Sequence, residues 1–70
     1  TMTSESIIKE GLRKHYEGII GLAEANVKIY MNQSVGIGEH ADILEAVDGE
    51  LAKIADAQDK IDVLDTYFQD

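Results

Sequence analysis

The sequence predicts an all-α fold, an antiparallel hairpin of two long helices that dimerises into a four-helix bundle. Apolar residues recur at helical spacing over two segments, residues 4–31 and 41–68. The only stretch rich in turn-forming residues, residues 32–40, separates these segments. Proline and cysteine are both absent, so no proline breaks either helix and no disulfide or thiolate–metal bond holds the chain together.

The first predicted helix, residues 4–31, has an apolar seam whose members are alternately four and three residues apart. Tyr16, Ala23 and Tyr30 run beside the seam and widen it to the stripe of a helix that faces a core. Ser4 is the expected N-cap. The seam consists of Ile8, Leu12, His15, Ile19, Leu22, Asn26 and Ile29.

The second predicted helix, residues 41–68, has a comparable seam that drifts from one flank to the other, as expected for a helix of 3.6 residues per turn. Gly49 is a weak point that would allow a bend. The seam consists of Leu44, Val47, Leu51, Ile54, Gln58 and Ile61, with Ile43, Ala57, Leu64 and Phe68 on its flank.

The width of these stripes favours a dimer. Each stripe spans about three heptad positions, and two helices cover only part of each other's apolar surface. Pairing of two hairpins buries the remainder with one symmetry operation. A three-helix monomer broken near Gly49 and a higher oligomer are the alternatives. Close backbone packing is suggested by small residues spaced seven apart on the first helix: Ser4, Gly11, Gly18 and Ala25.

Two polar residues interrupt the first seam. His15 is open to interpretation as a metal ligand or pH switch, but polar residues such as His15 and Asn26 in a bundle seam more typically set register and oligomeric state. The Glu-x-x-His motif of di-metal bundles is absent, because Leu12 and Ile37 precede the histidines by three residues. The sequence therefore predicts no metal ion and no other cofactor. A weak alternative is a divalent-cation site at the junction of loop and helix: Glu39, His40 and Asp42.

The charge of the chain is distributed unevenly. Six lysines and arginines against fourteen acids give a net charge of −8, yet residues 1–31 are neutral and residues 39–70 carry the whole excess. This balance argues against nucleic acid or an anionic membrane as a direct partner, and it suits a basic protein. Four aspartates at intervals of three residues form the candidate acidic surface for such a partner: Asp56, Asp59, Asp62 and Asp65.

No catalytic residue is predicted. The chain has no cysteine, and its few serines have no paired histidine and acid at a suggestive spacing. A domain of 70 residues also offers little concave volume for a substrate. No apolar run approaches the ~20 residues that span a bilayer, and the start of the chain has no targeting pattern. We therefore expect residues 1–70 to form a single, non-enzymatic, cytoplasmic domain.

Two resemblances bear on these expectations. In architecture the predicted hairpin resembles the plasmid copy-number repressor, which dimerises into a four-helix bundle and binds RNA through a basic face. The corresponding face here is mixed or acidic, so the RNA role is not implied. Residues 35–43, 53–55 and 64–68 resemble small uncharacterised proteins encoded by marine tailed bacteriophages. This resemblance implies an accessory protein that acts inside a bacterium.

The function expected from the sequence is protein–protein contact without chemistry, by a homodimer. The first alternative is an acidic mimic of nucleic acid that occupies the binding site of a basic host protein. The second alternative is the weak divalent-metal site at the junction of loop and helix.

Overall fold

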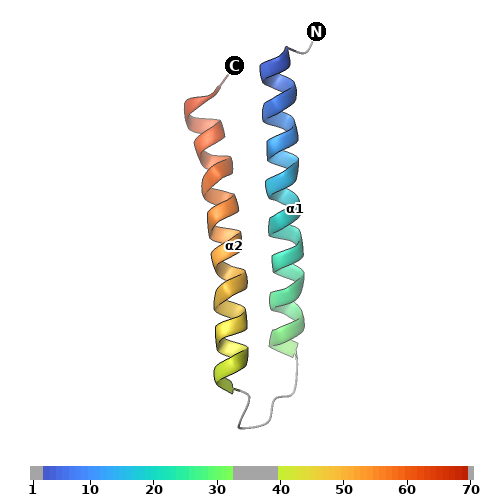
Figure 1. Ribbon diagram of the computed structural model, residues 1–70, viewed down its shortest axis with the longest axis vertical. Coiled ribbons are helices and arrows are strands. Elements are labelled where there is room, and N and C mark those ends of the chain that lie inside the picture. Colours follow the sequence, from blue (N-terminus) through green and yellow to red (C-terminus); the bar gives the residue numbers. More distant parts are fainter. Residues whose placement is uncertain (1–2, 33–39, 70) are drawn as a thin grey trace.

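The computed structural model describes residues 3–32 and 40–69, except for the side chains of residues 40 and 41. They form two helices, α1 (Ser4–Asn32) and α2 (His40–Tyr67), and no strand occurs in these ranges. The helices run antiparallel, side by side along their whole length, and both chain ends lie at the same end of the hairpin (Figure 1). The predicted all-α hairpin is confirmed, with each boundary within one residue of the expected position.

α2 is continuous through Gly49. The alternative in which the second helix breaks there into a three-helix bundle is therefore not adopted. A Cβ atom built on Gly49 would meet nothing within 4 Å, so this glycine does not serve a close approach within the hairpin.

The N-terminus of α1 is capped by Thr3. The Oγ1 atom of Thr3 accepts a hydrogen bond from the backbone N–H of Ser6 at 3.1 Å, three residues on, as an N-cap side chain does. The backbone N–H of Ile7 also donates to the Thr3 carbonyl at 3.0 Å. The expectation that Ser4 is the cap was wrong by one position, because Ser4 is itself the first helical residue.

The two helices meet along heptad lines, in which successive residues are alternately four and three apart. Such spacing keeps one line of each helix against the other over many turns. In α1 the buried or half-buried residues of this contact line are Lys9, Arg13, Tyr16, Ile20, Ala23, Val27 and Tyr30. In α2 they are Ile43, Val47, Glu50, Ile54, Ala57, Ile61 and Leu64.

The predicted seams differ from these contact lines. Every member of the α1 seam lies one residue before the contact line, and Leu22 and Ile29 are largely exposed. The α2 seam shares Val47, Ile54 and Ile61 with the contact line, whereas its other members, Leu44, Leu51 and Gln58, are exposed. The α1 seam is therefore not where α1 meets α2, and its role between two copies stays a prediction.

The interior of the hairpin is small. Among the described residues only Ala23, Val27, Ala57 and Ile61 are buried. The two alanines let the helix backbones approach closely, while valine and isoleucine supply most of the buried apolar volume. The molecule measures 56 × 18 × 12 Å. A hairpin of these dimensions is too thin to enclose more side chains by itself.

Polar contacts join the helices near their open end. Arg13 forms a two-pronged ion pair with Asp65, and the Lys9 ammonium donates to the Phe68 carbonyl. Farther along, the Lys60 ammonium lies 5.6 Å from the centre of the Tyr16 ring, a cation–π arrangement. None of these contacts was foreseen from the sequence. The aliphatic stems of lysine and arginine can occupy contact-line positions while their charged ends reach the edge.

Candidate interaction surfaces

The hairpin is flat and has two broad faces. The helical periodicity determines which residues lie on each face. Successive helical residues are separated by about 100° around the axis, so the residues before and after a contact residue point to opposite sides. Antiparallel helices have opposite senses of rotation when viewed from one end. Residues that precede the contact line on both helices therefore share one face, and residues that follow it share the other.

The face formed by preceding residues is called here the apolar face. Its α1 half is the predicted α1 seam, and its α2 half includes Val63 and Tyr67. Glu5 of α1 and two aspartates of α2, against two lysines of α2, give this face a net charge of −1. Six of the eleven large exposed hydrophobic residues in the described chain lie here, with exposed fractions of 38 to 74 %: Ile8, Leu12, Leu22, Ile29, Val63 and Tyr67.

The face formed by following residues is called the acidic face. It carries six acids against two bases, a net charge of −4. Glu10–Lys14 and Glu24–Lys28 form ion pairs of 3.5 and 3.6 Å along its α1 half. Such exposed pairs add little stability. The large exposed apolar side chains on this face are Leu44 and Leu51 of α2 and Ile7 and Met31 of α1.

The two polar residues of the α1 seam, His15 and Asn26, lie exposed on the apolar face. The His15 ring is 5.5 Å from the Tyr16 ring, in a tilted arrangement. Neither residue is buried within the hairpin, so neither determines the register between α1 and α2. The prediction that they set the register of an oligomer applies only to contact with another molecule.

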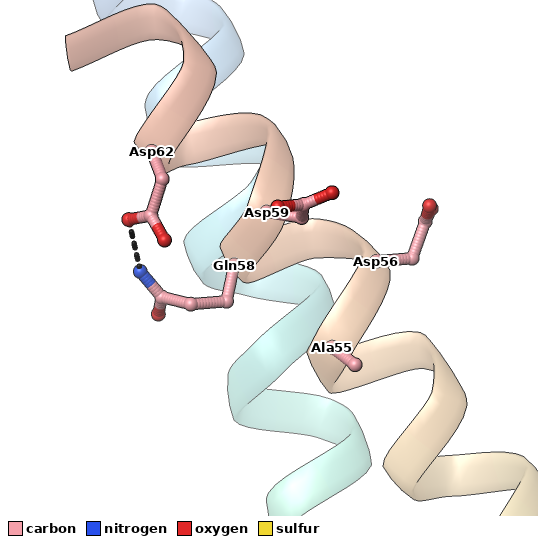
Figure 2. Close-up of a pocket in the computed structure, with 5 residues that line it drawn as sticks. All are labelled: Ala55, Asp56, Gln58, Asp59 and Asp62. Atoms are coloured by element: carbon pink, nitrogen blue, oxygen red, sulfur yellow. Dashed lines mark hydrogen bonds between the residues drawn. The ribbon is translucent and has the colours of Figure 1, made fainter. Parts of the chain in front are cut away.

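The four predicted acidic-surface residues do not form one surface. Steps of three residues rotate the position backward by about 60° per step on a helix of 3.6 residues per turn. Figure 2 shows the result: Asp56 and Asp62 project to opposite sides of α2, with Asp59 between them. Asp56, Asp59 and Asp62 line a shallow depression together with Ala55 and Gln58.

Most of these carboxylates have partners. Asp62 accepts a hydrogen bond from the Gln58 side-chain amide at 3.1 Å, as Figure 2 shows. Asp56 lies 3.2 Å from the Lys60 ammonium. Asp65 is not at the depression, because it pairs with Arg13 at the edge of the helix contact. Asp59, at the outermost position of α2, is left as the most available carboxylate of the four.

The Arg13–Asp65 pair also alters ionisation. The hydrogen bond from Arg13 lowers the pKa of Asp65 below its usual value, against the opposing effect of burial. The same hydrogen bond raises the pKa of Arg13. Both groups are half exposed, so water screens the interaction. The pair therefore aligns the two helices more than it stabilises them.

A groove opens on the apolar face at the end of the hairpin that holds both termini. Ile8 and Leu12 form its α1 wall, and Leu64 and Phe68 form its α2 wall. Glu5 and Lys9 lie at its margin, so the lining is mostly apolar. The groove extends the exposed hydrophobic surface of α1 across to α2. An apolar side chain of a partner would have contacts on two sides here.

The small residues of α1 are not needed for packing within the hairpin. A Cβ atom on Gly11 or Gly18 would meet nothing within 4 Å. Close approach of the α1 backbone to α2 therefore does not explain them. Both glycines lie at the outermost position of α1, between the apolar face and the acidic face.

The predicted cation site, Glu39, His40 and Asp42, falls largely outside the described residues, and Asp42 alone has a described side chain, which is exposed. Across residues 3–32 and 42–69, no group of three or more histidine or acidic side chains could hold a metal ion. In the same part of the chain, neither helix has the length and hydropathy that crossing a membrane requires.

Comparison with protein-family models, with curated proteins and with solved structures finds no significant match in any of the three.

Proposed function

We propose that this chain is a small, acidic, non-catalytic protein–protein interaction module that works as a homodimer. The observation that carries the proposal is the apolar face, where Leu22 is 73 % and Ile8 62 % exposed. Contiguous exposed apolar surface of this kind marks a contact with another molecule.

The surface area of the hairpin supports the same conclusion. A compact monomer of 7.7 kDa has about 4,300 Å² of accessible surface. The hairpin has 5352 Å², about 1,000 Å² more. Burial of that excess on each of two copies would give an interface of about 2,000 Å², the upper end of the standard size. One partner of equal size is therefore sufficient to complete the fold.

Sedimentation equilibrium over a wide range of protein concentration tests the homodimer. We expect a species of about 15 kDa, twice the 7.7 kDa of one chain. The helical content should fall on dilution as the dimer dissociates, because only four of the described residues are buried within the hairpin. A fully helical 7.7 kDa species at every concentration would overturn the proposal.

A second candidate is an acidic mimic that occupies the binding site of a nucleic-acid-binding protein. The observation that favours it is the charge of α2, whose eight acids and two bases give a net charge of −6. Asp59 and Asp62, on the outer side of α2, are placed for such a contact. The resemblance to phage-encoded proteins makes nucleic-acid-binding proteins of a bacterium the first partners to test.

Displacement of a fluorescent DNA duplex from a purified bacterial nucleoid protein tests this candidate. A mimic should release the duplex at low salt and lose this ability as the salt concentration rises. The variant Asp59→Asn with Asp62→Asn should compete more weakly than the wild type. Equal competition by the variant, or none by the wild type across a panel of such proteins, would exclude mimicry.

A further inference from the structure

We propose that the second copy binds the apolar face by antiparallel pairing of the two α1 helices, in one register. Leu12 then faces Ile29 of the partner subunit, His15 faces the partner's Asn26, and Ile19 faces the partner's Leu22. This inference rests on the proposed homodimer and names its surface, its direction and its register.

Charge selects the face. Each copy has a net charge of −8, so two copies repel one another at long range. Contact between two acidic faces would bring together surfaces of −4 each, whereas two apolar faces carry only −1 each. The apolar face also carries most of the large exposed hydrophobic residues. A second copy therefore gains the most contact and the least repulsion on this face.

Symmetry selects the direction. A two-fold axis across the width of the hairpin makes the α1 helices antiparallel and lays each α2 over the α2 of the partner. The whole 56 × 18 Å face is then covered. A two-fold axis along the hairpin that pairs the α1 helices in parallel leaves the α2 helices on opposite flanks, outside the interface. Of these two ways of pairing α1 with the partner's α1, only the antiparallel one covers the whole face.

The polar residues select the register. In an antiparallel pair of α1 helices with heptad spacing, each residue of one helix faces one residue of the other. The two residue numbers add up to the same value for every facing pair, and that value defines the register. The register with His15 opposite the partner's Asn26 gives both polar groups a hydrogen-bonding neighbour and pairs Leu12 with Ile29 and Ile19 with Leu22. A shift of one heptad would bury His15 against the partner's Ile19, and a buried polar group without a partner is costly.

The α2 helices fit the same arrangement. In the proposed register, the two-fold axis of the dimer crosses α1 between Ile20 and Gly21. Because Arg13 lies level with Asp65 in the hairpin, the axis passes α2 near Gln58. Asp56 and Lys60 lie on either side of this point. Each Lys60 thus comes opposite the partner's Asp56, and the ion pair of 3.2 Å within one chain extends into a network of four charges.

Disulfide trapping tests the register directly, because the chain has no cysteine of its own. Equal amounts of His15→Cys and Asn26→Cys are mixed, allowed to exchange subunits and oxidised. The mixture should form a disulfide-linked heterodimer, since the two positions face each other. Each variant alone should form little disulfide-linked dimer, because identical positions in the two copies are about 16 Å apart along the helix pair.

A matched control uses the acidic face. Glu17→Cys mixed with Glu24→Cys has the same summed position along α1 but lies on the opposite side of the helix. This mixture should give several times less linked dimer than the test mixture. Leu12→Cys mixed with Ile29→Cys provides a second pair in the proposed register, should either polar variant fail to become helical.

The outcomes separate this inference from the proposed function. Efficient linkage of His15→Cys with itself would establish a parallel pair and overturn the register. Linkage of the control pair above the test pairs would move the interface to the acidic face. Failure of both test pairs in a protein that sediments at twice the chain mass would reject this pairing of the α1 helices and leave the homodimer standing. A monomeric mass would reject both.

Discussion

Arg13 of α1 and Asp65 of α2 form a two-pronged contact across the hairpin: Nη1 donates to Oδ2 at 3.3 Å, and Nη2 donates to Oδ1. It is the only ion pair between the helices among the described residues. Arg13 lies on the contact line and Asp65 directly follows it, so the pair bridges from the interior to the acidic face. The contact fixes which residues of the two helices lie level.

Replacement of Asp65 by Asn should reduce the loss of stability at low pH. The pKa of Asp65 is lowered in the folded chain, so the carboxylate adds stability above its unfolded pKa of about 3.8. This contribution disappears as the pH falls through the folded pKa. Arg13 stays charged throughout that range. Thermal melts followed by circular dichroism from about pH 6 to about pH 2 should show a smaller decrease for the variant.

The effect should be small, because both side chains are half exposed. Asp62→Asn serves as the control, since Asp62 contacts only Gln58 on its own helix. An identical pH dependence for Asp65→Asn and the wild type would show that the pair does not contribute to folding.

Replacement of Ile61 by Ala should destabilise the hairpin strongly. Ile61 is 7 % exposed and is the largest of the four residues that are buried in the described part of the chain. Removal of a buried isoleucine side chain to alanine costs about 2–5 kcal/mol. Urea denaturation at a fixed chain concentration measures the change. Ile7→Ala, at a position 57 % exposed, should change the free energy of unfolding by less than about 0.5 kcal/mol. Similar losses at both positions would contradict the assigned core.

Replacement of Thr3 by Ala should destabilise α1 by about 1 kcal/mol, because it removes the acceptor for the Ser6 backbone N–H. Ser4→Ala should have a much smaller effect, since Ser4 is inside the helix. The two variants are compared by thermal or urea denaturation. A larger loss for Ser4→Ala would restore the N-cap that the sequence alone predicted.

Periodicity predicted both helices well, because amphipathic segments of this length have no competing structure once proline is absent. It did not identify the line along which they meet. Leu22 and Ile29 are more hydrophobic than their neighbours Ala23 and Tyr30, so a pattern of hydrophobicity favours the wrong line of α1. Close packing of two helices instead favours a small residue such as Ala23.

The candidate surfaces were predictable only in part. Spacing showed the four aspartates as a spiral, but the pairing of Asp65 with Arg13 depends on which helix faces adjoin, which no local pattern encodes. The exposed face of α1 likewise became visible only once α2 was seen to cover the neighbouring line. The apolar stripe of α1 is wide enough to contact both α2 and another molecule. Its width alone does not show which residues contact α2 and which stay exposed.

One measurement tests the central claim, that the apolar face joins two copies. Leu22 and Leu44 have nearly equal exposed fractions, 73 and 71 %, but lie on opposite faces. Sedimentation equilibrium of Leu22→Asp and Leu44→Asp is compared with the wild type. We expect dimers of about twice 7.7 kDa for the wild type and Leu44→Asp, and dissociation at the same concentrations for Leu22→Asp. Dissociation of Leu44→Asp while Leu22→Asp stays dimeric, or a monomeric wild type, would contradict it.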